Sequence, residues 1–344
     1  MEKYDIIIVG GGPVGLYTAK LLQKDFKVLV LEKEKELGKK ACSGLYSKKI
    51  FEFVPEGDFI ENEIDGCTLH SPNGVKKHFD IKQRPFVVDR EEFNKFLAEG
   101  VESLKIGCKV ESIETGKVNV DGIKVKTNQG EFHSDIIIGA DGSRSVVRQH
   151  WKAKPFEIVS GLIAMVEQDD SSRDVGVWFD KKQTEDGFLW KIPRGKRVEY
   201  GMLGLDVSYS KLEKFFGLKN YQKIAAPIPV GLQKSFFERT LLIGDAASQT
   251  KPWSLGGVLF GFLAANVAKR VLKNCFDKQN FSEKDLQGYE SGWKKEFGGA
   301  IEKGMFFREF YKELDNKKID EVFKHVDGFG LNDVDMDNPF SVIE

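Results

Sequence analysis

The sequence predicts an α/β protein with two sheets and a helical C-terminal segment, and three patterns lead to this prediction. A β-branched strand, a glycine-rich turn and a helix follow one another at the N-terminus, as in a parallel sheet flanked by helices. Alternating strands rich in aromatic residues occupy residues 156–230, and these favour an antiparallel second sheet. Helical spacing then covers residues 282–326.

The first of these patterns carries a dinucleotide-binding fingerprint. Residues 4–9 (Y-D-I-I-I-V) form the apolar strand, and Gly10, Gly12 and Gly15 follow in the pattern G-x-G-x-x-G before helical residues 16–22. Gly10 permits the tight turn, Gly12 lets the backbone approach a pyrophosphate, and Gly15 lets helix and strand pack closely. The helix N-terminus then presents unpaired N–H groups to the phosphates.

A second strand supports the same interpretation. Residues 27–31 (K-V-L-V-L) lead to Glu32, seventeen residues beyond Gly15. A carboxylate at this place accepts hydrogen bonds from the adenosine ribose hydroxyls. An ordinary glycine-rich turn would leave Glu32 unexplained, so the order of elements predicts Rossmann-type dinucleotide binding.

Composition excludes several classes of protein. The 344 residues include 52 basic and 53 acidic side chains, so the net charge implies no nucleic-acid partner. The four cysteines are scattered without a C-x-x-C pair, which argues against a zinc site or a disulfide framework and for a reducing compartment, and no metal site is predicted. The first strand begins by residue 4, which leaves no room for a signal peptide, and residues 255–272 are too short and too polar to span a bilayer. We expect a cytoplasmic monomer, with peripheral contact to a membrane left open.

The remaining elements follow from local turn and period signals. Residues 71–74 (S-P-N-G) precede hairpin strands within 75–88, and a helix is expected over 90–102. Residues 108–139 read as an antiparallel meander with turns at Asp121-Gly122 and Gln129-Gly130, ending in a buried strand at 135–138. The second sheet includes strands at 175–179 and 188–192, after which a strand at 241–243 and a helix at 257–272 return to the first domain.

These elements predict a discontinuous domain organisation. Residues 1–155 and 235–281 form the nucleotide-binding domain, residues 156–234 form a β-sheet substrate domain, and residues 282–344 form the C-terminal helical segment.

A second nucleotide signal lies about 230 residues beyond the fingerprint, in T-L-L-I-G-D-A-A at 240–247. Asp245 follows a strand, where it can bind the ribityl or pyrophosphate part of a cofactor, although an N-cap aspartate would look the same. Gly256, Gly257 and Val258 then open a helix whose free N–H groups can face the N1/O2 edge of a flavin and stabilise its reduced anion. The fingerprint alone fits NAD or FAD equally. The two signals together indicate a Rossmann-type FAD-binding domain.

Arg90 is a further cofactor candidate. It follows residues 87–89 (V-V-D), from which it can reach the cofactor phosphates or ribityl chain. A lone arginine is more often a surface residue, so both interpretations stay open.

Taken together, these residues resemble the FAD flavoproteins built like para-hydroxybenzoate hydroxylase, and within them the geranylgeranyl reductase family with its digeranylgeranylglycerophospholipid reductases. The resemblance covers nearly the whole chain. It rests on residues 6–15, K-A-C-S-G-L-Y-S-K at 40–48, F-V-V-D-R-E-E-F-N-K-F-L at 86–97, G-A-D-G-S at 139–143 and I-G-D-A-A at 243–247. The most specific part is G-F-L-W-K-I-P at 187–193 with Gly201 beyond it, which is similar to the family's Y-x-W-x-F-P followed by G-x-G.

The chain departs from this family at three places. Phe188 replaces the usual tyrosine, and Gly201 and Gly204 are one residue further apart than in G-x-G. Residues 252–257 (P-W-S-L-G-G) replace the start of the family's P-x-T-G-G-G-I with a bulkier segment. These departures concern the substrate more than flavin binding.

The resemblance implies a set of site residues. The predicted FAD contacts are Gly10, Gly12, Pro13, Val14, Gly15, Glu32, Lys33, Cys42, Ser43, Gly44, Arg90, Val110, Asp141, Gly142, Gly244, Asp245, Gly256, Gly257 and Val258. The predicted catalytic residues are Cys42, Phe188 and Trp190. Cys42 is a redox partner or proton source beside the flavin, or else a small buried hydrophobe. Phe188 and Trp190 share one face of a strand, as the wall of an apolar substrate cavity or as plain core.

The function that the resemblance implies is reduction of C=C bonds in an isoprenoid lipid by reduced FAD. Three alternatives remain: a monooxygenase of an aromatic or prenylquinone substrate, a flavin-dependent halogenase, and a non-catalytic flavin-loaded lipid binder. The electron donor is not determined by the sequence, and NADPH, a ferredoxin or a reduced quinone carrier would each fit.

Overall fold

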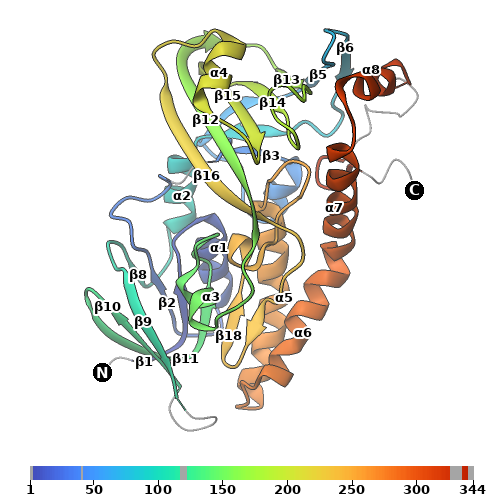
Figure 1. Cartoon of the computed structure of the whole chain (residues 1–344). Coiled ribbons are helices and arrows are strands. Elements are labelled where there is room, and N and C mark those ends of the chain that lie inside the picture. Colours follow the sequence, from blue (N-terminus) through green and yellow to red (C-terminus); the bar gives the residue numbers. More distant parts are fainter. Residues whose placement is uncertain (1–2, 40–41, 117–121, 326–334, 340–344) are drawn as a thin grey trace. The chain divides into compact units, whose positions relative to one another are not determined.

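The computed structural model describes residues 3–39, 42–116, 122–325 and 335–339. Its described parts form two compact units (Figure 1). Unit 1 comprises Met1–Lys39, Glu91–Glu157 and Pro229–Glu302, and unit 2 comprises Lys40–Arg90, Ile158–Ile228 and Lys303–Glu344. Each unit has its own sheet and its own core.

Unit 1 is built on an eight-stranded sheet with the path β17-β18-β11-β1-β2-β8, to which β10 and β9 are added beside β11. Strands β18, β11, β1, β2 and β8 run parallel, while β17, β10 and β9 pair antiparallel. The strands are β1 (Lys3–Val9), β2 (Val28–Leu31), β8 (Leu104–Lys105), β9 (Val110–Thr115), β10 (Ile123–Thr127), β11 (Gly130–Gly139), β17 (Phe236–Phe237) and β18 (Thr240–Leu242).

Helices cover this sheet and bury its apolar strands. They are α1 (Pro13–Leu22), α2 (Arg90–Ala98), α3 (Val146–His150), the short 3-10 helix η2 (Gly244–Ala247), α5 (Val258–Asp277), α6 (Glu283–Trp293) and the π-helical turn η3 (Lys294–Gly298). Helix α5 packs beside both α1 and α6 (Figure 1). Ile6, Ile7 and Ile8 of β1 are fully buried because a parallel strand covered on both faces has no solvent side.

Unit 2 is built on a seven-stranded sheet in the order β16-β12-β15-β14-β13-β5-β6. Its pairs are mostly antiparallel, but β13 and β5 run parallel. The strands are β5 (Gly66–His70), β6 (Lys76–Asp80), β12 (Glu157–Asp170), β13 (Asp174–Trp178), β14 (Leu189–Pro193), β15 (Gly195–Gly204) and β16 (Gln222–Val230). A small sheet β3-β7-β4 joins β3 (Leu45–Tyr46), β7 (Phe86–Val88) and β4 (Ile60–Glu63).

The helices of unit 2 are η1 (Lys48–Glu52), α4 (Tyr209–Phe216), α7 (Gly299–Lys312, which begins in unit 1) and α8 (Asn316–His325). Helix α4 begins at Ser208, whose side chain accepts a hydrogen bond from the Lys211 N–H, and ends at Gly217 in the left-handed region. Its buried Leu212 packs on the sheet residues Leu162 and Met202.

The predicted α/β fold with a parallel nucleotide-type sheet, a second sheet and C-terminal helices is confirmed. Two details were wrong. The helix expected over 90–102 ends at Ala98, and the hairpin at residues 71–74 joins β5 to β6, while β7 pairs with β3 and β4. Residues 40–90 pack with the second sheet, so the compact units divide the chain differently from the predicted domains. The predicted turn at Asp121 lies outside the described residues.

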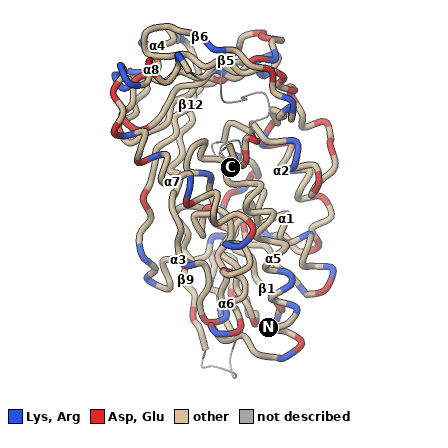
Figure 2. Tube along the Cα trace, turned by 90° about the vertical axis from the view of Figure 1, so that its right-hand side faces the viewer, with Lys and Arg blue, Asp and Glu red and all other residues tan. Residues whose placement is uncertain are grey.

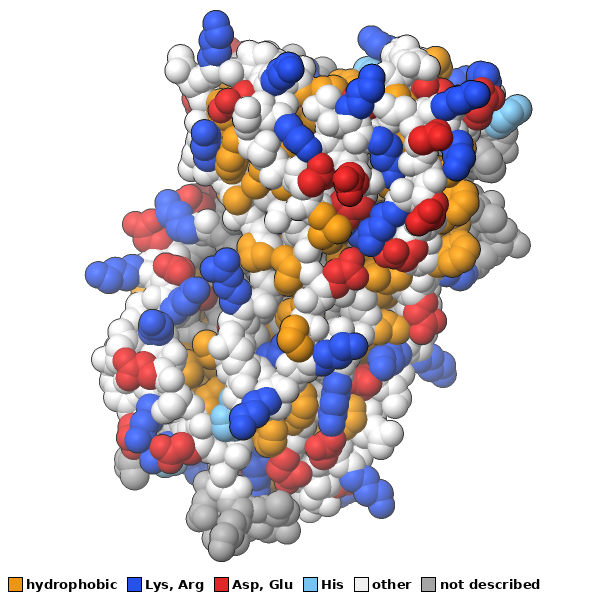
Figure 3. All heavy atoms as spheres, viewed as in Figure 1, with side chains coloured by type: hydrophobic (Ala, Val, Ile, Leu, Met, Phe, Trp, Pro, Cys, Tyr) orange, Lys and Arg blue, Asp and Glu red, His pale blue; other side chains and the backbone are white. Residues whose placement is uncertain are grey.

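Basic and acidic side chains, which are nearly equal in number, are mixed along the chain and on the visible surface (Figure 2, Figure 3). Basic and acidic residues alternate along the trace in Figure 2, and they are interspersed on the face seen in Figure 3. Across the described residues, no helix combines the length and the apolar character needed to cross a membrane.

Candidate functional site

The predicted nucleotide turn has the geometry of a phosphate cradle. Gly10 has φ +110, and a Cβ at Gly15 would lie only 2.0 Å from the Gly10 carbonyl oxygen, so helix α1 packs directly on the turn. Gly12 caps α1 without a side-chain hydrogen bond, Pro13 occupies the first turn, and a Cβ at Gly12 would meet no atom within 4 Å. Open space therefore faces helix N–H groups, which is what a pyrophosphate needs.

Glu32 is joined to this turn by its carboxylate. One oxygen, Oε2, accepts from the Gly11 N–H at 2.6 Å, and the other, Oε1, accepts from the Glu34 N–H at 2.8 Å. The buried Asn94 of α2 donates to the Gly11 carbonyl at 3.3 Å. Glu32 therefore fixes the turn in addition to being the predicted ribose ligand, and Asn94 is a support that the sequence did not single out.

Asp141 follows β11, whose Gly139 pairs with Val9 at the end of β1. A Cβ at Gly10 would lie 2.8 Å from the Asp141 Cα, so the second predicted segment lies against the fingerprint turn. The Asp141 Oδ2 accepts from the Val146 N–H at 2.7 Å, and burial raises the pKa of this carboxyl to about 6. Gly142, the next predicted contact, has φ +79.

The G-D signal forms a 3-10 turn rather than the start of a long helix, because α5 begins only at Val258. Gly244 and Asp245 open this turn directly after β18. The Gly244 N–H donates to Gln249 Oε1 at 2.8 Å, Gln249 Nε2 donates to the Tyr289 hydroxyl at 3.0 Å, and that hydroxyl donates to the Leu242 carbonyl at 2.8 Å. A fully buried chain from α6 therefore holds the turn that carries Asp245.

The segment between this turn and α5 contains two non-glycine residues with left-handed backbone conformation. Ser248 and Leu255 both have positive φ, at 56 and 59, a region that non-glycine residues seldom occupy. Leu255 stands where the resembling family has a glycine. A Cβ at Gly257 would lie 3.0 Å from the Gln249 carbonyl oxygen, so the start of α5 is packed against the same segment.

In unit 2 the structure groups Cys42, Gly44 and Arg90 around Tyr46. The Gly44 N–H donates to the Cys42 sulfur at 3.4 Å, and the Tyr46 hydroxyl lies 3.8 Å from that sulfur. Burial raises the pKa of Tyr46, which also contacts the Arg90 guanidinium. The Cys42 thiol is thus held by two polar neighbours, and Tyr46 is a site residue that the sequence did not reveal.

Phe188 directly precedes β14 and Trp190 is its second residue, and both are half-buried. Their rings are 6.0 Å apart, edge to face, and Phe188 also contacts Phe179 of unit 2. Trp190 pairs with Gly201, and a Cβ there would lie 2.0 Å from the indole Cζ2. This contact gives a physical reason for the glycine after the family's aromatic motif.

Several predicted cofactor residues contact protein with their side chains. Val14 lies against Gly244 and Gly261, since a Cβ at Gly261 would be 2.4 Å from the Val14 Cγ2. Val110 is 6% exposed within the core of unit 1. The side chain of Lys33 is 68% exposed and pairs with Glu34.

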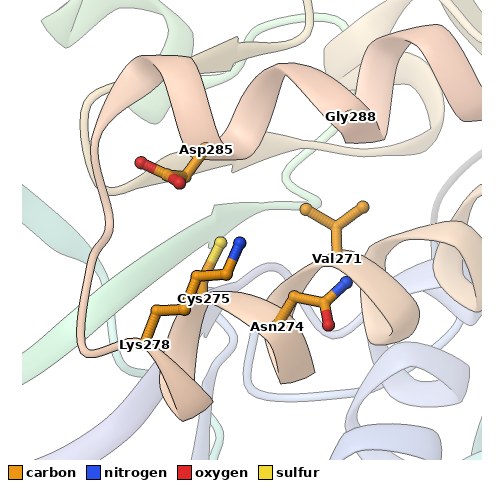
Figure 4. A pocket seen from close by; sticks show the side chains of 6 residues that line it. All are labelled: Val271, Asn274, Cys275, Lys278, Asp285 and Gly288. Atoms are coloured by element: carbon orange, nitrogen blue, oxygen red, sulfur yellow. The ribbon is translucent and has the colours of Figure 1, made fainter.

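A separate cavity of about 140 Å³ lies between α5 and α6. Figure 4 shows Val271, Asn274, Cys275 and Lys278 on one side and Asp285 on the other. Burial raises the pKa of the Cys275 thiol to about 11, so this cysteine is unreactive. The cavity is smaller than typical ligand pockets, and none of its lining residues belongs to the fingerprint turn or to α1.

The residues of unit 1 therefore fit a dinucleotide, and the comparisons with known proteins agree. The model of the NAD(P)-binding Rossmann-like domain family matches residues 8–53. An uncharacterized protein of Methanocaldococcus jannaschii is 30% identical over 96% of this chain and 90% of its own length. The digeranylgeranylglycerophospholipid reductase of that organism is 27% identical over 97% of this chain and 93% of its own length.

Solved structures share the fold along the whole chain. The geranylgeranyl bacteriochlorophyll reductase-like protein of Thermoplasma acidophilum has a TM-score of 0.89 at 22% identity and covers 100% of this chain and 96% of its own. Halogenase PltM, solved with phloroglucinol and FAD, has a TM-score of 0.72 at 16% identity over 96% of this chain and 80% of its own. The structures share the fold, and the sequence likeness to the curated relatives over nearly the whole length shows that the chain belongs to the geranylgeranyl reductase family of flavoproteins, together with the digeranylgeranylglycerophospholipid reductases.

Proposed function

We propose that this protein is an FAD-dependent reductase that saturates C=C bonds of a geranylgeranyl or other isoprenoid lipid. The observation that carries the proposal is the full-length likeness to digeranylgeranylglycerophospholipid reductase, combined with a nucleotide turn that fits a pyrophosphate. When bound, reduced FAD supplies the hydride for the alkene. The residues of this chain bind and orient the two reactants and supply or relay the proton.

The nucleotide would be held by unit 1. The open N-terminus of α1 at Gly12 would take the pyrophosphate, and the Glu32 carboxylate would accept from the ribose hydroxyls. Asp245 would bind the ribityl part from its turn, and the N–H groups that begin α5 at Val258 would stabilise negative charge on the reduced ring.

The alkene would meet residues of unit 2. An isolated C=C bond has no polar handle, so an apolar wall is needed to hold it, and Phe188 and Trp190 supply adjoining aromatic rings. Cys42 is the proposed proton source, because its sulfur has the Tyr46 hydroxyl and the Gly44 N–H as polar neighbours.

Anaerobic turnover tests the proposal. Purified protein with its FAD reduced by dithionite is mixed with a geranylgeranylated glycerophospholipid, and the product is weighed by mass spectrometry. We expect a gain of about two mass units for each double bond reduced, with the flavin reoxidised. A product that appears only in air and gains the mass of an oxygen atom would instead establish the monooxygenase alternative.

Matched cysteine variants test the proton source. We expect Cys42→Ser to lose turnover while it keeps bound FAD. Cys67→Ser is the control, because burial raises the pKa of the Cys67 thiol to about 12 and so keeps it in the neutral form. Equal turnover by both variants would remove Cys42 from the reaction.

We also propose peripheral contact between α7 and a lipid surface. Phe306 and Phe310 are 69% and 53% exposed and lie one turn apart on the helix. Exposed aromatic rings partition into the interfacial region of a bilayer. The double variant Phe306→Ser/Phe310→Ser should sediment less with anionic liposomes than the parent protein, and equal sedimentation would contradict the contact. The monomeric state stays a prediction, which light scattering would test.

A further inference from the structure

A buried group of charged residues in unit 2 connects two of the predicted catalytic segments. We call it the Arg194 cluster, and its members are Glu61, Asp89, Arg194, Arg197 and Glu199. The side chain of Arg194 is 3% exposed and that of Glu199 is 0% exposed. Both belong to the hairpin that joins β14 to β15, directly beyond the aromatic motif.

Arg194 joins two separate backbone segments. Its Nη1 donates to the Ser43 carbonyl at 2.5 Å and lies 3.0 Å from Glu199 Oε2. Its Nη2 donates to the Val88 carbonyl at 2.7 Å. The second carboxylate on Arg194 is that of Glu61, whose Oε2 lies 2.5 Å from Nη2. The planar guanidinium has several donors in fixed directions, so one side chain holds two carbonyls and two carboxylates at once. A lysine ammonium has no such fork.

The two carbonyls that Arg194 holds belong to the Cys42 segment and its neighbouring strand. Gly44 has φ +67, and a Cβ there would lie 2.4 Å from the Val88 carbonyl oxygen. The Val88 N–H donates to the Gly44 carbonyl at 3.0 Å, and the Gly44 N–H donates to the Cys42 sulfur. Arg194 therefore fixes the backbone from which the thiol of Cys42 projects.

The other side of the cluster fixes Trp190. Glu199 Oε1 accepts from the indole Nε1 of Trp190 at 2.8 Å, while its second oxygen binds Arg194. The indole ring also lies directly over Gly201, where there is no room for a Cβ, and this contact restricts the position of the ring. The Trp190 indole, Glu199, Arg194 and the Ser43 carbonyl thus form one continuous series of hydrogen bonds.

Stability alone does not account for this arrangement. Burial raises the pKa of Glu199 although Arg194 opposes the shift, so desolvation outweighs the attraction of the guanidinium. Buried ion pairs are often replaced by apolar residues without loss of stability. Their best-supported use is to specify one geometry, and here that geometry relates an aromatic wall residue to a thiol.

We propose that Arg194 and Glu199 are positioning residues that set the Cys42 backbone and the Trp190 indole in a fixed relation to one another. The catalytic consequence rests on the proposed function, and the geometric one does not. Both residues act through the segments that they hold and are not proposed to touch the reacting atoms. At the outer side of the cluster Arg197 pairs with both Glu61 and Asp89, and Glu61 pairs in turn with Arg194.

Three variants separate positioning from stability. Arg194→Lys keeps the charge and removes the fork, and Glu199→Gln keeps an acceptor for Trp190 but none for Arg194. Arg197→Met is the matched control, because it removes a half-buried arginine from the same cluster. The full-length protein is used throughout, and chemical unfolding shows that each variant is folded under the conditions of the assay.

The first readout is site-specific alkylation of Cys42 by iodoacetamide, followed by peptide mass spectrometry, and it needs neither lipid nor turnover. We expect Arg194→Lys and Glu199→Gln to be alkylated roughly threefold faster or more, because the released segment opens without global unfolding. Arg197→Met should match the parent protein within about twofold, whatever its loss of stability. Unchanged or slower alkylation in both Arg194→Lys and Glu199→Gln would overturn the proposal, as would an equal increase in Arg197→Met.

The second readout is turnover by the FAD-loaded enzyme. We expect Arg194→Lys to lower kcat roughly a hundredfold through a small misplacement, while the FAD dissociation constant and KM stay nearly unchanged. A loss of FAD binding equal to the loss of kcat would assign Arg194 to general structure and contradict the positioning role. If no isoprenoid lipid is reduced by the parent protein, the proposed function fails, and the alkylation result still decides the positioning role.

Discussion

The buried hydroxyl of Tyr289 gives a prediction whose size follows from the structure. It donates to the Leu242 carbonyl and accepts from Gln249, which in turn accepts from the Gly244 N–H beside Asp245. Tyr289 and Gln249 are both 0% exposed. Tyr289→Phe therefore removes one donor and one acceptor at a place that water does not reach.

The expected cost follows from the two groups left behind. A buried polar group that loses its partner costs about 1–3 kcal/mol, so two such groups should lower the free energy of unfolding by about 3 kcal/mol. Urea unfolding would measure this as a lower midpoint with an unchanged slope. Because Gln249 holds the turn that carries Asp245, we also expect weaker FAD binding, which flavin fluorescence would report.

Tyr209→Phe is the matched control for this prediction. The Tyr209 hydroxyl donates to the Ile224 carbonyl at 2.7 Å, but both residues are partly exposed and water can replace the bond. We expect a loss of about 1 kcal/mol or less and no change in FAD binding. A Tyr289→Phe protein as stable as the Tyr209→Phe protein would refute the reasoning, because it would mean that the buried chain does not hold the Asp245 turn.

Three further predictions concern single side chains. Glu32→Gln should weaken FAD binding roughly tenfold, because the amide would place an N–H against one of the two backbone N–H groups that donate to the carboxylate. Equilibrium dialysis would measure the FAD affinity, and an unchanged affinity would exclude the ribose role. The pKa of Asp141 is raised to about 6 from 3.8, so the folded state binds the proton more tightly, and the free energy of unfolding falls as pH rises from about 4 to about 6. Asp141→Asn should reduce this fall by at most about 3 kcal/mol, as measured by urea unfolding of the FAD-free protein at pH 4 and pH 7. An unaltered pH dependence would contradict the shift. Gly201→Ala should displace the Trp190 indole at a cost of about 1–3 kcal/mol and change its fluorescence while FAD stays bound, whereas an unchanged spectrum would contradict the contact.

The elements that the sequence predicted best are those specified by neighbouring residues. Strand β1, helix α1 and strand β2 match the expected ranges within three residues, because β-branched runs, Pro13 and the glycines of the turn act locally. Glu32 was predicted as the ribose ligand from its place at the end of the second strand and its distance to Gly15. The second role of its carboxylate, as acceptor for Gly11, was missed because it depends on how the chain folds back.

The supports of the site could not be predicted for the same reason. Arg194 acts on the Ser43 and Val88 carbonyls, which are 151 and 106 residues away in sequence, and no local pattern indicates that distance. Tyr289 was one aromatic residue in a helical segment. The transfer of residues 40–90 to the second sheet depends on the parallel pairing of β13 with β5, which joins strands more than 100 residues apart.

The left-handed backbone at Leu255 has a consequence for engineering this loop. A leucine with φ +59 costs roughly 1 kcal/mol or more relative to glycine, yet its side chain is only 8% exposed and fills space in the fold. Glycine at this position would remove the strain and also leave a void and a chain with more freedom when unfolded. Strain and packing therefore oppose one another at this position. A paired change, glycine at 255 together with a larger neighbour to fill the vacated space, would relieve the strain and keep the packing while it gives the loop more freedom.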